Sequence, residues 1–108
     1  MDAKQKYLMS EDYLAAVHPQ YQEMVRGSNA AMERAIDNPG LPVKEWAGSY
    51  YLFADGVLFH LTRDDQTGGR DRWIAGEQGA DEYCDPYRTL RDLVAAVGAG
   101  QVQPAQEG

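Results

Sequence analysis

Apolar residues in the first third of the chain recur three and four positions apart, which is the spacing of one face of an α-helix. The stripe starts shortly after Ser10, whose hydroxyl suits an N-cap, and it ends at Asn38-Pro39-Gly40, a strong stop signal. The sequence therefore predicts a helical N-terminal part with one face buried. The stripe comprises Leu14, Val17, Tyr21, Met24, Ser28, Ala31 and Ala35.

Pro19 interrupts this stripe and leaves two interpretations. Either one helix is kinked at Pro19, or a short helix ends near Val17 and a second helix begins with Pro19 in its first turn. The second is favoured, because proline is well tolerated at the first helical position. The same spacing also fits a coiled coil. Pro19, Gly27 and Ser28 are poorly suited to the contact between two coiled-coil helices, so a helix packed on a sheet is favoured.

The period changes from helical to two at Ser49, which indicates β-strands. Asp55-Gly56 is a strong signal for a type I′ turn, because both central residues of that turn need positive φ. Closing a hairpin there pairs Ala54 with Val57, Phe53 with Leu58, Leu52 with Phe59, Tyr51 with His60, and Tyr50 with Leu61. One face then carries Tyr50, Leu52, Ala54, Val57, Phe59 and Leu61, and is expected to meet the helices. The other face carries Tyr51, Phe53, Leu58 and His60, and is expected to stay partly open.

The rest of the chain predicts one more strand and one more helix. The strand is expected at Arg72–Ala75, between a glycine-containing loop (Asp64–Asp71) and an acidic loop (Glu77–Asp85). Asp85-Pro86 would start the last helix, and Gly98 would end it. The predicted fold is thus α+β: N-terminal helices, a three-stranded antiparallel β-meander and a C-terminal helix, with a helical layer on one sheet face. Residues 1–98 would form a single domain and 99–108 a flexible tail.

The acidic composition of the chain disfavours some classes of binding partner. Seventeen acidic residues against ten basic ones give the 108-residue chain a formal charge of −7, which disfavours nucleic acid and anionic membranes and suits a basic protein. Net charge that serves only solubility is the alternative. There is no apolar run of about 18 residues and no secretory signal pattern, and Cys84 is the single cysteine. A cytoplasmic protein is expected. The excess of arginine over lysine hints at a bacterial or phage genome.

Residues suited to catalysis or metal binding do not form recognisable motifs. His18, His60 and Cys84 lack zinc-site spacing, and the loop from Asp64 to Asp71 fails the EF-hand pattern at its third, fifth and twelfth positions. No nucleophile elbow or phosphate-binding loop is present. Neither a metal nor a cofactor is expected. The pair of His60 and Tyr51 is the one to check for acid–base geometry.

These observations favour a binding protein over an enzyme. The expected surface is the open sheet face with an acidic rim, namely Tyr51, Phe53, Leu58 and His60 with Glu77, Asp81 and Glu82. Its partner would be another, basic protein, which the chain would inhibit or block in the manner of immunity proteins, antitoxins or phage factors. Two alternatives remain: a small-molecule or catalytic pocket around Tyr51 and His60, and a homodimer joined through the open face.

Overall fold

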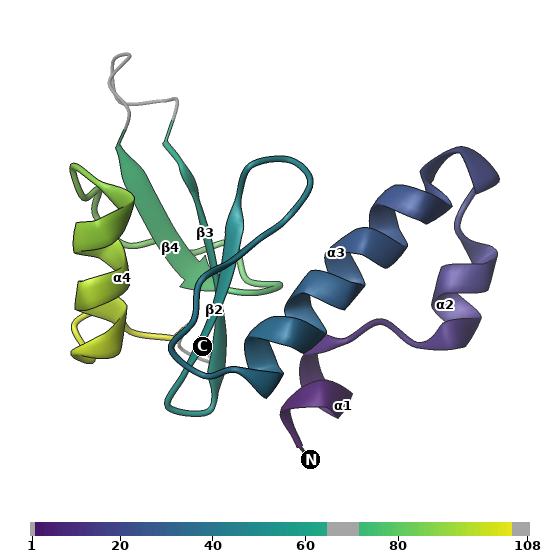
Figure 1. Ribbon diagram of the computed structural model, residues 1–108, viewed down its shortest axis with the longest axis horizontal. Helices are drawn as coiled ribbons and strands as arrows, with labels where there is room; N and C mark the ends of the chain where they lie inside the picture. The colour runs from purple at the N-terminus through teal and green to yellow at the C-terminus, as the bar shows by residue number, and fades with distance from the viewer. Residues whose placement is uncertain (1, 65–71, 105–108) are drawn as a thin grey trace.

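The computed structural model describes residues 2–64 and 72–104 and has an α+β fold (Figure 1). Its helices are α1 (Ala3–Tyr7), α2 (Glu11–Ala16), α3 (Pro19–Asp37) and α4 (Leu90–Gly98). Its strands are β1 (Val43–Lys44), β2 (Tyr50–Ala54), β3 (Val57–Arg63) and β4 (Trp73–Glu77), which form one antiparallel sheet in the order β1-β2-β3-β4. The predicted class and the N-terminal and C-terminal helices are confirmed, but the sheet has four strands instead of three.

Two short elements were missed by the sequence analysis. Strand β1 has only two residues, too few to show an alternating pattern. Helix α1 precedes the apolar stripe and is defined by a capping box, in which the Asp2 carboxylate accepts from the backbone N–H of Gln5 at 2.9 Å and the Gln5 side chain returns to the Asp2 backbone. Tyr7 at its end is buried, so α1 contributes to the core despite its length.

The interpretation of two helices separated at Pro19 is confirmed. Ser10 caps α2 by accepting the N–H of Tyr13 at 3.1 Å. Pro19 is the first residue of α3, and the Nδ1 atom of His18 accepts the N–H of Gln20 at 3.2 Å. Because proline has no N–H to satisfy, it fits the first turn, where backbone donors lack helical partners. Figure 1 shows that α3 runs out beyond the sheet and carries α2 against its far end.

The central hairpin has the predicted register at all five pairs, from Tyr50 with Leu61 to Ala54 with Val57. Asp55 and Gly56 both have positive φ, 51° and 78°, as a type I′ turn requires. The third predicted strand is present as β4, which runs two residues further than expected and pairs with β3. Most of the preceding loop, residues 65–71, lies outside the described part of the chain.

The predicted start of the last helix at Asp85 is wrong. Tyr87 forms a bridge with Trp73, with both backbone N–H···O distances at 2.8 Å, and this pairing holds the chain extended past Pro86. Helix α4 instead begins after Thr89, whose hydroxyl accepts the N–H of Asp92 at 3.0 Å. The start is therefore decided by a tertiary contact that the local sequence does not reveal.

The helix ends at Gly98, as predicted. Gly98 is its last helical residue, however, and the glycine that takes the left-handed conformation after the helix is Gly100, with φ of 75°. The N–H of Gln101 then bonds back to the carbonyl of Ala96 at 2.9 Å. This turn brings Val102 into the core, where it is buried. The segment expected to be a flexible tail thus packs at least as far as Val102, and 105–108 lie outside the described residues.

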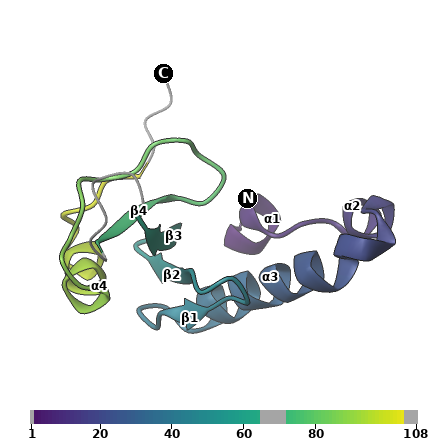
Figure 2. The same cartoon turned by 90° about the horizontal axis from the view of Figure 1, so that it is seen from above.

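Helices cover both faces of the sheet, so the predicted single helical layer is wrong. Figure 2 shows the sheet between α4 on one side and α1 with α3 on the other. The core under α4 includes Leu52, Phe59, Leu61 and Leu93; the core under α1 and α3 includes Tyr7, Met32, Tyr51 and Leu58. The hairpin is apolar on both faces, and burying both removes more apolar surface from water than burying one.

Among the described residues, no helix combines the length and the hydropathy that crossing a membrane requires.

Candidate functional site

The aromatic surface expected on the sheet is largely interior. Tyr51 is 4% exposed and Leu58 is fully buried, both beneath α1 and α3, and Phe53 packs half-buried beside them. The expectation that this face is open is therefore wrong. The cause is the missed helix α1 and the placement of α3 across β1 and β2. The open sheet face through which a homodimer was expected to form is therefore covered by α1 and α3.

A polar cluster lies within this interior and centres on Glu45, which follows β1. One oxygen of its carboxylate, Oε2, accepts from the Tyr51 hydroxyl at 3.0 Å and from the Ser28 hydroxyl of α3 at 3.2 Å. Burial and the Glu45 carboxylate together raise the pKa of Tyr51 far above its ordinary value. The phenol therefore stays neutral and donates to Glu45, whose carboxylate also binds Ser28 and so links α3 to the sheet.

His60 adjoins this cluster but does not bond to Tyr51. Their rings lie 5.5 Å apart, so the sequence analysis was correct in pairing them. The Nδ1 atom of His60 lies 3.0 Å from the Tyr83 hydroxyl, and its Nε2 atom lies 4.0 Å from Oε1 of Glu45. Burial lowers the pKa of His60, and the nearby Glu45 carboxylate opposes this only in part. The imidazole is therefore neutral at pH 7, with one nitrogen held by Tyr83.

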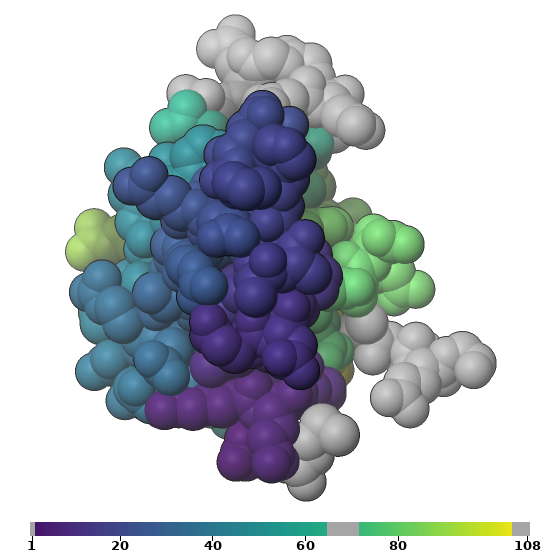
Figure 3. Space-filling model, turned by 90° about the vertical axis from the view of Figure 1, so that its right-hand side faces the viewer, coloured from purple at the N-terminus to yellow at the C-terminus, as the bar shows by residue number. Residues whose placement is uncertain are grey.

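The predicted acidic loop, Glu77–Asp85, separates into an inward and an outward part, because Glu77 is the last residue of β4 and only the residues after it form the loop. Glu77 is drawn inward, where its carboxylate accepts from the Tyr7 hydroxyl at 2.9 Å and pairs with Lys6 at 3.2 Å. Asp81 and Glu82 are exposed, as expected for a charged rim. The loop is seated on the sheet at Gly76, where the backbone carbonyl of Glu82 leaves no room for a Cβ. In Figure 3 the loop projects beside the face made by the N-terminal helices.

The largest exposed apolar side chain belongs to Trp46, which the sequence analysis did not select. It lies in the turn between β1 and β2 and is 64% exposed. Together with four residues along one side of α3, it lines an open groove of about 490 Å³; these are Gln20, Glu23, Met24 and Gly27. The available signal was a tryptophan in a short polar turn, Glu45-Trp46-Ala47-Gly48, with no apolar pattern around it to explain burial.

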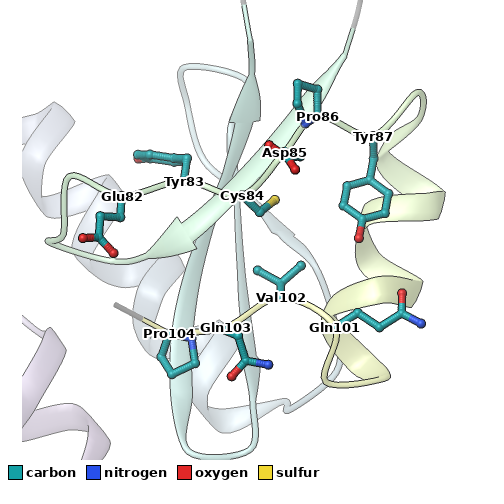
Figure 4. A pocket seen from close by; sticks show the side chains of 10 residues that line it. All are labelled: Glu82, Tyr83, Cys84, Asp85, Pro86, Tyr87, Gln101, Val102, Gln103 and Pro104. Carbon is teal, nitrogen blue, oxygen red and sulfur yellow. The ribbon is translucent and has the colours of Figure 1, made fainter. Parts of the chain in front are cut away.

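A second hollow, of about 500 Å³, lies between the chain at 82–87 and the segment after α4 (Figure 4). Cys84 and Val102 are at its centre, and the carboxylates of Glu82 and Asp85 belong to its lining. Burial raises the pKa of the Cys84 thiol, and its sulfur accepts from the N–H of Ala75 at 3.4 Å. Because the thiolate is the reactive form, this environment does not favour a nucleophilic cysteine.

Within 2–64 and 72–104, no three or more histidine, cysteine, aspartate or glutamate side chains come together in a way that could hold a metal ion. Most of the loop Asp64–Asp71, considered and rejected as a calcium site from its sequence, falls outside these ranges.

Comparison with known proteins gives no match to any family model, curated protein or solved structure.

Proposed function

We propose that this chain is a small acidic protein that binds a basic partner protein, and that the Trp46 groove is its main contact surface. The observation that carries the proposal is the exposure of Trp46 beside an open groove on α3. Tryptophan is among the residues most enriched at the energetic centres of protein interfaces. A tryptophan that is not needed for the core and lies next to a groove is well placed to serve as an anchor.

The shape and composition of the groove suit a protein segment. Met24 gives an adaptable apolar floor, and Gly27 leaves its part of α3 bare, with nothing within 4 Å of where a Cβ would lie. Gln20 and Glu23 add polar groups at the rim. The arrangement of an apolar centre with a polar edge is typical of protein interfaces.

Charge favours a basic partner. Among the described residues that line the groove, only Glu23 is charged, and the whole chain has a formal charge of −7. Asp81 and Glu82 add exposed negative charge on the loop after β4. Such charges increase the rate of encounter with a positively charged protein, and they repel nucleic acid and anionic lipid. Blocking a nucleic-acid-handling protein, as immunity proteins and antitoxins do, is the mode of action that fits this size and charge.

The experiment is affinity capture from the native host with three baits: the parent chain, Trp46→Ala and Leu41→Ala. Leu41 is the control because it is also apolar and half exposed but is not part of the groove. The parent and the Leu41 variant should retain the same basic protein, and the Trp46 variant should lose it. The dissociation rate of the purified complex should rise at least about tenfold on removal of Trp46.

Two outcomes would contradict the proposal. One is a partner retained equally by the Trp46 variant, and the other is the absence of any protein specific to the parent bait. Melting curves of the three baits should agree, because both side chains are largely exposed and neither belongs to the two cores.

A further inference from the structure

A separate pocket of about 430 Å³ lies at the end of the sheet, between the β1–β2 turn and the ends of β3 and β4. Its lining includes Lys44 and Arg63, the hydroxyl residues Ser49 and Thr62, and the ring of Trp73. None of the described residues that line it is acidic. The chain has seventeen carboxylate side chains and ten basic ones, so two cations without a carboxylate in the described lining are unusual for this protein.

Strand pairing brings the two cations to the same face of the sheet. Lys44 lies opposite Tyr50 in β2, and Tyr50 lies opposite Leu61 in β3. Arg63 is two residues beyond Leu61, so its side chain points to the same face. Within the part of the chain that the structure describes, the Lys44 ammonium makes no ion pair.

Arg63 is held in place by an aromatic support. Its guanidinium carbon lies 5.4 Å from the centre of the Trp73 ring, and Trp73 in turn meets Tyr50 edge-on at 5.9 Å. Trp73 belongs to the buried core under α4. Arg63 has a further interaction besides this ring. A guanidinium has five N–H donors, more than one partner can use, and a guanidinium that rests on a fixed ring loses little freedom on binding.

Ser49 and Thr62 also border the pocket, but their side chains alternate to the sheet face opposite Lys44 and Arg63. The buried Ser49 hydroxyl donates to the Thr62 hydroxyl at 3.1 Å, which fixes this end of the sheet. Gly48, with φ of 90°, turns the chain at the mouth of the pocket.

We propose that this pocket binds a small organic anion whose phosphate or carboxylate group lies between Lys44 and Arg63. Both anions accept charge-assisted hydrogen bonds from ammonium and guanidinium groups, and arginine can bind either in a bidentate manner. The volume is within the range of about 300–1,000 Å³ for small-molecule sites, which suits a ligand larger than a bare inorganic ion. This site is distinct from the Trp46 groove, and neither proposal depends on the other.

The test is a ¹⁵N-resolved titration of the full chain at low salt, which follows the amides of Gly48, Ser49 and Thr62. The probes are two matched pairs: adenosine 5′-monophosphate with adenosine, and indole-3-acetate with indole-3-acetamide. At least one anion should shift these amides, and its neutral counterpart should bind at least about tenfold more weakly, the effect of one charge-assisted contact. Which anion binds more tightly distinguishes phosphate from carboxylate.

Variants then assign the binding to the two cations. Lys44→Gln and Arg63→Gln should each weaken the anion by about tenfold. Arg34→Gln removes an exposed charge from α3, away from the pocket, and should leave binding unchanged. If Arg63→Gln lowers the melting temperature through loss of its contact with Trp73, the exposed Lys44 variant decides the matter. The proposal is overturned if neither anion shifts the pocket amides, if neutral and anionic probes bind alike, or if the Arg34 variant weakens binding as much as Lys44→Gln does.

Discussion

Leu52 and Leu58 are neighbours in the same hairpin but face opposite sides of the sheet. Leu52 is 1% exposed beneath α4, and Leu58 is fully buried beneath α1 and α3. Replacing either with aspartate would place a carboxylate in an apolar core. The cost is comparable to the whole stability of a small domain, on the order of 5 kcal/mol.

We therefore expect Leu52→Asp and Leu58→Asp to unfold the protein equally, as measured by thermal melts. Tyr13→Asp is the control, because Tyr13 is exposed on α2 and should tolerate the change. A Leu58 variant that melts like the parent would mean that α1 and α3 do not cover this face.

His60 gives the fold a specific dependence on pH. Burial lowers its pKa below the ordinary value of 6.5, so above that value the imidazole is neutral in both the folded and the unfolded chain. As the pH falls below 6.5, the unfolded chain takes up the proton first, and the free energy of unfolding decreases. His60 makes no further contribution to this decrease once the pH has fallen below the pKa of His60 in the folded chain.

Urea denaturation between pH 7.5 and the acid limit of folding should show this loss in the parent and a smaller loss in His60→Gln. The matched control is His18→Gln, which changes an exposed histidine at the start of α3. Parallel pH profiles for the parent and the His60 variant would contradict the linkage.

At the scale of elements, the acidic loop is held to β4 by the lack of a side chain at Gly76. A Cβ there would collide with the backbone carbonyl of Glu82, and backbone cannot move aside as a side chain can. Gly76→Ala should cost about 1–3 kcal/mol of stability, as overpacking does. Gly27→Ala on α3 has open space and should instead gain about 0.5–1 kcal/mol from better helix propensity. Denaturant midpoints of both variants test this contrast, and a neutral Gly76→Ala would show that the loop is not seated there.

The elements that could be predicted from the sequence are those set by local chemistry. The hairpin register follows from the Asp55-Gly56 turn, because these residue types tolerate the positive φ that the turn needs. The break before α3 follows from Pro19, because proline fixes its own φ and restricts the residue before it. The start of α4 could not be predicted, since the bridge between Trp73 and Tyr87 competes with the helical signal at Asp85-Pro86. That contact joins residues whose proximity depends on the whole sheet.

At the scale of the whole molecule, the candidate surfaces depend on which helices cover the sheet. The alternation of residues in the hairpin correctly predicted which side chains share a face. It could not predict that α1 and α3 cover the face with Tyr51 and Leu58. The proposed anchor, Trp46, could be recognised only once α3 lies beside the β1–β2 turn to form a groove. Asp81 and Glu82 are the two acidic positions of the expected site that remain exposed.

In the proposed interface, Trp46 is the apolar anchor, and the exposed carboxylates of Asp81 and Glu82 increase the rate of encounter. Charges outside the anchor act mainly on the association rate, whereas a buried aromatic side chain acts mainly on the dissociation rate. The reversal of Asp81 and Glu82 to lysine should therefore slow association at low salt and have little effect at high salt, where charges are screened.

The most direct test of the protein-binding account is surface plasmon resonance of the captured partner at two salt concentrations. It compares the parent, Trp46→Ala, and the double reversal of Asp81 and Glu82. The account predicts faster dissociation for Trp46→Ala at both salts, and slower association at low salt for the double reversal. Dissociation of the Trp46 variant at the parent's rate would contradict the central claim that this tryptophan anchors a partner.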